Sequence, residues 1–213
     1  MARPPGVRNQ DYHAKRLALV EAATNFVLQE DVLLPSFRQM AIATGASEPT
    51  LKHYFKNRSG LVIAIIEHLN KNADPLRNYL RQSFDSIEEA LEDYRDLAVR
   101  VSDDSKFVRG HVFGIREGLA DTKVFEAYIR NLVEPGAAAM AERIVKSPGG
   151  PVNYATAHIA ATHIFSIVLF QTCRKQLLGD ADPGSSQTKH QYHLMTNWFL
   201  RGMVNDPEGA GSK

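Results

Sequence analysis

Polar and basic side chains gather between residues 47 and 58, in a segment whose apolar residues have helical spacing. Leu51, Tyr54 and Phe55 recur at intervals of three and four, so a helix here would bury one face. The opposite face then carries Pro49, Thr50, Lys52 and His53. A helix with such a face fits the major groove of DNA, where base edges present a distinct pattern of donors and acceptors.

Each of these side chains suits a particular part of a DNA site. Pro49 and Thr50 are expected to approach base edges or thymine methyl groups. Lys52 and His53 are expected to bond a guanine edge or a phosphate. The hydroxyl of Tyr54 is expected to reach a phosphate while its ring stays in the core. The sequence therefore predicts a base-reading surface on this helix.

A second set of residues is expected to hold the phosphate backbone. Ser36 stands at the start of the preceding helix, where free backbone amides favour an anion. Lys56 and Arg58 follow the reading helix and add two positive charges. Phosphate contacts of this kind fix the register on the duplex, whereas base contacts carry the sequence information.

Two short helices and a tight turn must position these residues. Ser36 and Gln39 have the spacing of a capping box at the start of the first helix, and Gly45 is a typical residue just past a helix end. Ser47 is expected to cap the second helix, and Pro49 is tolerated in a first turn. The two elements together predict a helix-turn-helix.

The flanking segments also read as helices. A first helix is predicted from Asp11 to about Gln29, and Ser59 is expected to cap a fourth. The apolar run of this fourth helix, 61–66, predicts a connector helix that is buried on nearly all sides and ends near Asp74-Pro75. Residues 11–74 are therefore predicted to be a DNA-binding domain with a connector helix.

The remainder predicts an all-α protein, because strand-like alternation bounded by turns is missing. Further helices are expected over 76–83, 86–102, 105–119, 122–146, 152–178 and 186–203. Residues 75–204 would then form one helical domain, and 205–213 a disordered tail. Residues 1–10 contain Arg3 and Arg8 and predict a flexible basic arm, either in contact with the minor groove or simply disordered.

Composition limits the class of protein. Residues 1–60 contain eight basic and five acidic residues, a net charge of +3, whereas the remainder carries −2. A basic N-terminal part suits a polyanion. The chain has a single cysteine and no run of eighteen apolar residues, which predicts a cytoplasmic protein that does not span a membrane.

The segment from Leu19 to Leu61 resembles the N-terminal domain of the TetR family of transcriptional repressors. The positions that align with the family's pattern, at the same spacing, are Ala22, Ala23, Phe26, Ser36, Met40, Ala41, Gly45, Ala46, Ser47, Tyr54, Phe55, Lys56, Asn57, Arg58 and Leu61. The departures are Asp31 for a glycine, Thr44 for an alanine, Lys52 for a tyrosine and Arg58 for a lysine. The change at Lys52 alters one inferred phosphate contact. Beyond this segment the chain is similar only in length and helical style.

This resemblance implies a homodimer that binds a palindromic double-stranded operator, represses transcription and is released by a small-molecule effector. It also implies that 75–204 is a ligand-binding and dimerisation domain, in which 152–178 and 186–203 form the dimer interface as a four-helix bundle. The apolar stripes of these two helices fit plain core as well. Residues on one stripe of the first helix are Ile159, Thr162, Ser166, Phe170, Cys173 and Leu177, and those on the second are Leu194, Trp198 and Arg201. No metal or other cofactor is expected, and activation in place of repression stays open.

The effector site is predicted from local features alone. Gly110, Gly114 and Gly118 recur at four-residue steps, and either close helix packing or room for a ligand would compensate for their low helix propensity. The candidate ligand-binding residues are His111, Phe113, Gly114, Arg116 and His163. An amphiphilic molecule with an apolar bulk and one acceptor group would suit them, although His163 also fits a hydrogen-bonded core histidine.

Two other classes of protein compete with this interpretation. A helical enzyme would need a reactive constellation, and the chain offers only His190 and His193 at a metal-binding spacing without a third ligand. A helical adaptor that binds proteins would not need a basic outer face on a capped helix. DNA binding differs from both because it must weaken steeply with salt.

Overall fold

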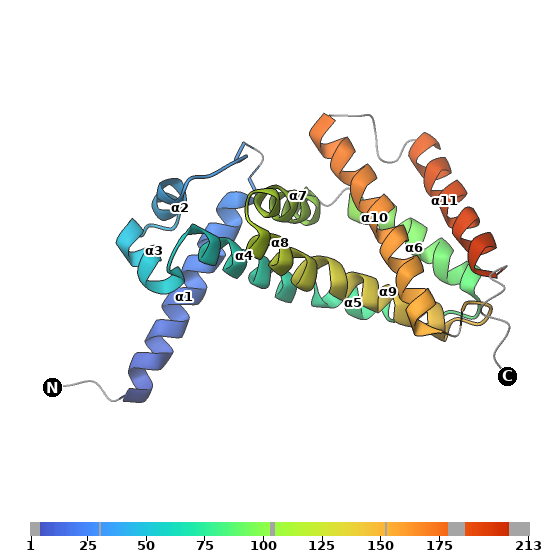
Figure 1. Cartoon of the computed structure of the whole chain (residues 1–213), viewed down its shortest axis with the longest axis horizontal. Helices are drawn as coiled ribbons and strands as arrows, with labels where there is room; N and C mark the ends of the chain where they lie inside the picture. The colour runs from blue at the N-terminus through green and yellow to red at the C-terminus, as the bar shows by residue number, and fades with distance from the viewer. Residues whose placement is uncertain (1–4, 30, 103–104, 152, 179–185, 205–213) are drawn as a thin grey trace. The chain divides into compact units, whose positions relative to one another are not determined.

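The regular secondary structure of the described part of the chain is entirely helical. The computed structural model describes residues 5–29, 31–102, 105–151, 153–178 and 186–204 (Figure 1). Its elements are α1 (Pro5–Val27), α2 (Phe37–Ala43), α3 (Glu48–Phe55), α4 (Arg58–Asn72), α5 (Asp74–Leu80), α6 (Ile87–Ser102), α7 (Ser105–Ala120), α8 (Thr122–Tyr128), the π-helical turn η1 (Ile129–Val133), α9 (Glu134–Lys146), α10 (Tyr154–Leu178) and α11 (Ser186–Val204). The described ranges contain no strand, which confirms the all-α fold class. The predicted tail, 205–213, lies outside them.

These helices form two compact units. The first comprises the described residues of Met1–Asn72 and Phe113–Asn131, and the second those of Ala73–Val112 and Leu132–Lys213. The break after Asn72 lies close to the predicted boundary at residue 74. The prediction of one continuous domain over 75–204 differs from the structure, because the second half of α7 and all of α8 belong to the first unit.

The first unit contains a helix-turn-helix made of α2 and α3, with α1 and α4 packed against it. Gly45 turns the chain after α2 with a φ of +62°, a left-handed conformation that glycine adopts without steric cost. The buried apolar residues of these four helices include Leu19, Val20, Ala23, Val27, Met40, Ala41, Leu51, Phe55, Leu61, Val62, Ile65 and Ile66. Helix α4 contacts α1, α3 and α8, as its apolar run predicts.

Helix α1 begins at Pro5, about two turns before the predicted start at Asp11. The predicted flexible arm, 1–10, is therefore wrong for residues 5–10, and 1–4 lie outside the described residues. Proline is favoured in the first turn of a helix, because its φ is already helical and its missing amide has no partner to lose. Pro5 thus starts a helix where the sequence was interpreted as an arm.

Helix α4 is capped by a different residue from the one predicted. The side-chain oxygen of Asn57 accepts a hydrogen bond of 2.9 Å from the amide of Gly60, which is the usual role of an N-cap residue. Ser59 was predicted for that role and lies inside the helix. Its hydroxyl instead donates to Asp121 over 2.5 Å.

The second unit packs α9 along α10, with α5 and α6 on α9 and α11 on α6 and α10. Its buried cluster includes Leu80, Ile87, Leu91, Tyr94, Met140, Ile144, Ala157, Ala161, Ile164, Tyr192 and Met195. One fully buried arginine, Arg143, lies among these helices. It donates to the backbone carbonyls of Leu80 and Tyr79 over 2.9 Å each, and to Asp93 over 2.6 Å. The hydroxyl of Tyr79 also donates to Asp93.

The predicted helix over 122–146 is interrupted by the π-helical turn between α8 and α9. Pro135 explains the break, because a proline removes one helical amide and its ring crowds the carbonyl four residues earlier. The side chain of Asn131 donates to the carbonyl of Ala127 over 2.7 Å and so satisfies one backbone acceptor beside the turn.

Helix α10 is, among the described residues, long and apolar enough over Tyr154–Arg174 to cross a membrane by length and composition. Only 28% of that stretch is buried inside the chain. One side of α10 nevertheless packs against α9 and α11, as in a helix of a soluble bundle. The other side leaves large apolar residues exposed, among them Ile159 and Phe170.

Candidate nucleic-acid interface

Helix α3 presents the face that its apolar spacing predicts. Leu51 and Phe55 are buried, whereas Pro49, Lys52 and His53 are exposed and Thr50 is half-buried. The ring of Tyr54 differs from the prediction. It is half-buried rather than part of the core, because it stacks on Tyr12 of α1.

Both capping serines hold the starts of their helices. The hydroxyl of Ser36 accepts from the amide of Gln39 over 3.2 Å, and the side chain of Gln39 accepts from the amide of Ser36 over 2.8 Å. The hydroxyl of Ser47 accepts from the amide of Thr50 over 3.2 Å and lies 2.8 Å from its hydroxyl. These bonds confirm the predicted capping box and the predicted cap of the reading helix.

The turn between α3 and α4 is unusually tight. Lys56 has a φ of 69° and a ψ of −54°, and the amide of Asn57 donates to the carbonyl of Phe55 over 2.8 Å. This is a γ-turn of the strained kind, which only the surrounding structure can maintain. A Cβ added at Gly60 would lie 2.0 Å from the carbonyl oxygen of Phe55, so only glycine fits there. The backbone of Lys56 is therefore held in one conformation, while its side chain is exposed.

Arg58 has a different role from the predicted phosphate contact. Its guanidinium bonds both carboxylate oxygens of Glu117 of α7, over 2.5 and 2.9 Å, and also the carbonyl of Pro35 over 3.0 Å. Glu117 is buried, so the ion pair lies at the edge of the interior rather than on an open face. Ser59 hydrogen-bonds Asp121, which lowers the pKa of that carboxyl. Both contacts join α4 to the segment at the end of α7.

The candidate effector residues of α7 and α10 differ in their surroundings. His163 is exposed on α10, where its Nδ1 lies 2.8 Å from the carbonyl of Ile159. His111 is buried between the rings of Phe107 and Phe165, and burial lowers its pKa to about 4. Spacing along two separate helices does not report which faces meet, so the effector site stays a prediction.

The remaining candidates serve packing in the first unit. A Cβ added at Gly114 would lie 2.2 Å from the ring of Tyr128, and one at Gly118 would lie 2.7 Å from the ring of Phe125. Close approach of α8 therefore explains these two glycines, the first of the two predicted explanations. Phe113 is buried. Arg116 is half-buried, and burial lowers the pKa of its guanidinium although Glu117 partly opposes this shift.

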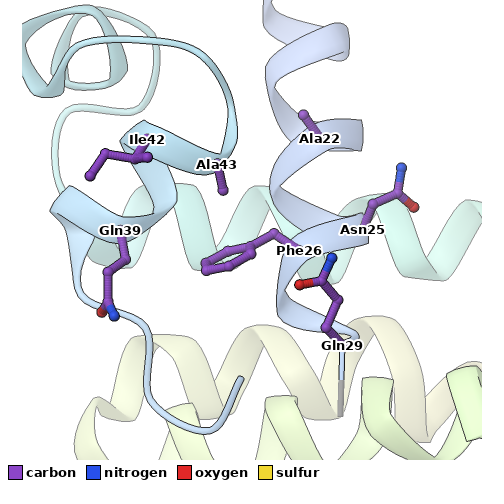
Figure 2. A pocket seen from close by; sticks show the side chains of 7 residues that line it. All are labelled: Ala22, Asn25, Phe26, Gln29, Gln39, Ile42 and Ala43. Carbon is purple, nitrogen blue, oxygen red and sulfur yellow. The ribbon is translucent and has the colours of Figure 1, made fainter. Parts of the chain in front are cut away.

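An open hollow lies between α1 and α2, away from these residues (Figure 2). It is lined by Ala22, Asn25, Phe26 and Gln29 of α1 and by Gln39, Ile42 and Ala43 of α2. Figure 2 shows the ring of Phe26 in the gap between the two helices. The lining includes no charged side chain, and Gln39 is already used in the capping box. The hollow therefore lacks the convergent polar groups of a binding site.

Helix α10 carries an exposed apolar face, and α11 exposes one large apolar residue, Trp198. Ile159 and Phe170 of α10 are 60% and 68% exposed, and Trp198 of α11 is 67% exposed. The predicted stripe on α10 is split, because Ser166 is also exposed whereas Thr162 is half-buried and Cys173 is buried. Leu177 lies outside the described side chains. Of the predicted stripe on α11, Trp198 and Arg201 are exposed and Leu194 is half-buried.

His190 and His193 are not joined by a third metal-ligating residue within the described part of the chain. Both are exposed on α11, and His193 lies 3.2 Å from a guanidinium nitrogen of Arg95 and 3.0 Å from the side-chain nitrogen of Asn197. Throughout the described ranges, no group of three histidine, cysteine, aspartate or glutamate residues has the arrangement of a metal site.

Tyr12 is the residue at this interface that the sequence interpretation missed. Its ring lies 4.8 Å from that of Tyr54 and 6.0 Å from that of His53. The signal was present, because Tyr12, Arg16 and Leu19 continue the helical register of the buried face of α1 toward the N-terminus. Its contact with α3 joins residues about 40 positions apart in sequence, which no local pattern reports.

Several solved structures with a similar arrangement of helices are TetR-family regulators. A transcriptional regulator from Mesorhizobium loti assigned to that family is 16% identical, with a TM-score of 0.62 over 91% of this chain and 96% of its own. Another, from a Rhodococcus species, is 16% identical, with a TM-score of 0.61 over 90% and 100%. AlkX of a Dietzia strain, a TetR-family repressor implicated in the biodegradation of n-alkanes, is 22% identical, with a TM-score of 0.52 over 89% and 97%.

The sequence matches no protein-family model and no curated protein. The structural likeness extends over about nine tenths of the chain, whereas the sequence resemblance covers only the N-terminal segment. A likeness at such low identity establishes the fold, and function has to be argued from the site. The chain therefore has the all-α fold of the TetR-family transcriptional regulators.

Proposed function

We propose that this protein is a TetR-like transcriptional regulator, a cytoplasmic repressor that binds a palindromic DNA operator as a homodimer. The observation that carries the proposal is helix α3, whose serine-capped start and buried Leu51 and Phe55 leave Lys52 and His53 exposed together. A helix held in this way on a helix-turn-helix is the element that enters the major groove in many DNA-binding proteins. No catalytic role is part of the proposal.

Base reading is assigned to the outer face of α3. Pro49, Thr50, Lys52 and His53 are the proposed base contacts, with Lys52 suited to a guanine edge or a phosphate. The hydroxyl of Thr50 lies beside that of Ser47, which orients both at the start of the helix. Discrimination would then depend mainly on Lys52 and His53, whose exposed side chains are not enclosed by the cap.

Phosphate binding is assigned to the two ends of the helix-turn-helix. Ser36 and Ser47 mark helix starts whose amides favour an anion. Lys56 follows α3 on the fixed γ-turn, and the hydroxyl of Tyr54 stays a proposed phosphate ligand. Arg58 is no longer part of this set, because its guanidinium is used by Glu117 and Pro35.

Dimerisation is assigned to the exposed faces of α10 and α11. Single exposed apolar residues are common, but Ile159, Phe170 and Trp198 recur on neighbouring helices that pack together. A second copy placed on this face would bury them and form a four-helix bundle. Two reading helices related by two-fold symmetry then match two half-sites of a palindrome.

Control by a small-molecule effector is proposed on the resemblance to the family alone. The five candidate residues in α7 and α10 do not support a particular site, so the class of effector is left open. Release from DNA in the presence of a compound would be the defining property. That test needs an operator, which makes DNA binding the first experiment.

The full-length protein should select a palindromic sequence from a random DNA library. Binding to that sequence, followed by fluorescence anisotropy, should weaken steeply as salt rises, because each neutralised phosphate releases counterions. The Lys52→Ala, His53→Ala double variant should lose sequence preference. Lys146→Ala removes a lysine from an exposed position on α9, outside both the helix-turn-helix and the proposed dimer interface, and should leave binding unchanged. Failure of the wild type to select any sequence would sink the proposal and favour a protein-binding adaptor.

The dimer is tested by the molar mass in solution. Light scattering after size exclusion should give twice the chain mass of 23.7 kDa for the wild type. Glutamate at Phe170 and Trp198 should give the single-chain mass and weaker operator binding. Glutamate at the exposed Leu119 is the matched control, because Leu119 lies on α7 outside the proposed interface. A monomeric wild type would exclude this interface.

A further inference from the structure

The N-terminal half of α1 contributes an aromatic ring to the exposed surface of α3. Tyr12 lies in the third turn of α1, with helix on both sides, because α1 begins at Pro5. Its ring lies 4.8 Å from that of Tyr54, and the two planes are inclined by 31°. This distance is within the range for interacting aromatic pairs. The two tyrosines therefore form one aromatic platform across α1 and α3.

The imidazole of His53 stands on this platform. Its centroid lies 6.0 Å from the ring of Tyr12 and 5.1 Å from that of Tyr54, with interplanar angles of 80° and 83°. Edge-to-face contacts of this kind are favourable, because the positive edge of one ring meets the negative face of another. Two such contacts restrict the direction of the His53 side chain on a face that is otherwise open.

The rest of the contact fixes α1 against α3. The guanidinium of Arg16, one turn after Tyr12, lies 5.2 Å from the ring centroid of Phe55. Leu19, Val20 and Ala23 continue the same face of α1 into the core. Tyr12 is therefore held by a rigid helix, and a rigid support is what a base-reading side chain requires.

We propose that Tyr12 is a specificity-determining positioning residue, which orients the imidazole of His53 toward one base pair. The inference rests on the proposed DNA-binding function and adds to it a residue outside the helix-turn-helix. Tyr12 acts through His53 and is not assigned a base contact of its own. Loss of its ring should therefore reduce discrimination at the base pair that His53 reads, and leave the phosphate contacts unchanged.

The test compares single-base-pair variants of the selected operator. Tyr12→Leu in the full chain should reduce discrimination at one position about 5-fold, in line with the usual strength of aromatic pairs. The same position should lose discrimination in His53→Ala, and the double variant should lose no more than His53→Ala alone. The salt dependence of binding should stay that of the wild type, because no phosphate contact is removed.

Two controls separate positioning from general damage. Tyr12→Phe keeps the ring and should retain wild-type discrimination. His13→Ala removes the other imidazole beside Tyr12, 5.7 Å from its ring, and should also leave discrimination unchanged. Equal losses at every operator position, or losses that add to those of His53→Ala, would overturn the proposal in favour of a structural role.

A measurement without DNA distinguishes this inference from the proposed function. Ring currents of Tyr12 and Tyr54 should shift the imidazole proton resonances of His53 in NMR spectra of the free protein. Tyr12→Leu should move these resonances, and Tyr12→Phe should preserve them. Unchanged resonances in Tyr12→Leu would overturn the positioning role even if the protein binds DNA. If the shifts appear but no DNA sequence is selected, the proposed function fails instead, and the specificity role of Tyr12 falls with it.

Discussion

An arginine–carboxylate pair with one buried member lies in each compact unit, and the buried member differs. In the second unit the side chain of Arg143 is 0% exposed and that of Asp93 is 21% exposed. In the first unit the carboxylate is buried instead, with Glu117 at 3% and Arg58 at 38%. The two pairs have similar distances, 2.6 and 2.5 Å, so their difference lies in the surroundings.

The surroundings decide what each pair holds together. Arg143 also donates to backbone carbonyls of α5 and α6, and the rings of Tyr79 and Phe84 lie beside its guanidinium. Both oxygens of Glu117 accept from Arg58, which also bonds the carbonyl of Pro35 before α2. The bonds of Arg143 fix the core of the second unit. The bonds of Arg58 fix the start of α4, beside the proposed DNA-binding turn.

Removal of Arg143 should have the largest effect of the changes considered. Arg143→Met keeps most of the side-chain volume but removes the donors to the carbonyls and to Asp93. Groups left buried without partners should lower the free energy of unfolding by about 4 kcal/mol. Chemical denaturation, followed by circular dichroism, measures the change.

A matched variant checks that burial is the cause. Arg81→Met removes an arginine from the same region whose partner, Glu142, is 35% exposed. Its cost should stay below about 1 kcal/mol, as for other solvent-accessible ion pairs. Similar losses for the two variants would mean that burial does not distinguish these arginines.

His111 extends the comparison to a buried group whose pKa is lowered by burial alone. The folded protein keeps the imidazole neutral down to about pH 4, whereas an unfolded chain protonates it below about pH 6.5. The unfolded state therefore binds more protons between these values, and stability falls as the pH drops from about 6.5 to about 4. The loss attributable to His111 should reach on the order of 3 kcal/mol.

The contribution of His111 is isolated by difference. Thermal or chemical unfolding would be measured from pH 4 to pH 7.5 for the wild type and for His111→Gln. The variant should show a smaller loss of stability on acidification. Parallel curves for the two proteins would contradict the assignment, because other titrating groups would then account for the whole dependence.

Removal of Arg58 should cost less than removal of Arg143 and should affect a different property. Arg58→Met leaves Glu117 buried without these donors and should lower stability by about 2 kcal/mol. The second change Glu117→Gln should restore most of that loss, because an amide is neutral. Operator affinity should fall with the single change, since the start of α4 and the loop before α2 lose a common anchor.

The rescue is the decisive part of this comparison. Full recovery of stability without recovery of DNA binding would indicate that Arg58 also meets a phosphate, as the sequence predicted. Recovery of both properties would support the structural role alone. Lys123→Met, an exposed cation on α8 in the same unit, serves as the charge control.

Local signals explain which parts of this molecule were predictable. The starts of α2 and α3 are specified by Ser36, Gln39 and Ser47, and the caps form as predicted. The all-α class and most helix boundaries follow from spacing and breakers in the same way. The break before α9 was missed, although Pro135 marks it in the sequence.

Long-range partners explain the rest. Arg58 and Glu117 are 59 residues apart in sequence, and Arg143 and Asp93 are 50 apart, so no local pattern joins them. Arg58 was assigned to phosphate because its position in the motif suggested it. The effector site is not specified locally for the same reason, because helical spacing in α7 and α10 does not determine which neighbours each face meets.

The smallest expected effect concerns the γ-turn at Lys56 in the first unit. The strain there lies in the backbone of Lys56 and not in an ion pair. Glycine adopts a positive φ without the steric cost that a lysine bears. Lys56→Gly should therefore raise the free energy of unfolding by about 1 kcal/mol, even though it removes a side chain. Operator affinity should fall, and the slope of affinity against salt should shrink by about one phosphate contact.

The opposite signs of these two effects make the test specific. Lys56→Ala removes the same charge without relieving the backbone, so it should weaken DNA binding equally and gain no stability. If Lys56→Gly is no more stable than Lys56→Ala, the turn is not strained. If both bind the operator like the wild type, Lys56 does not contact phosphate, and the tight turn serves only to join α3 to α4.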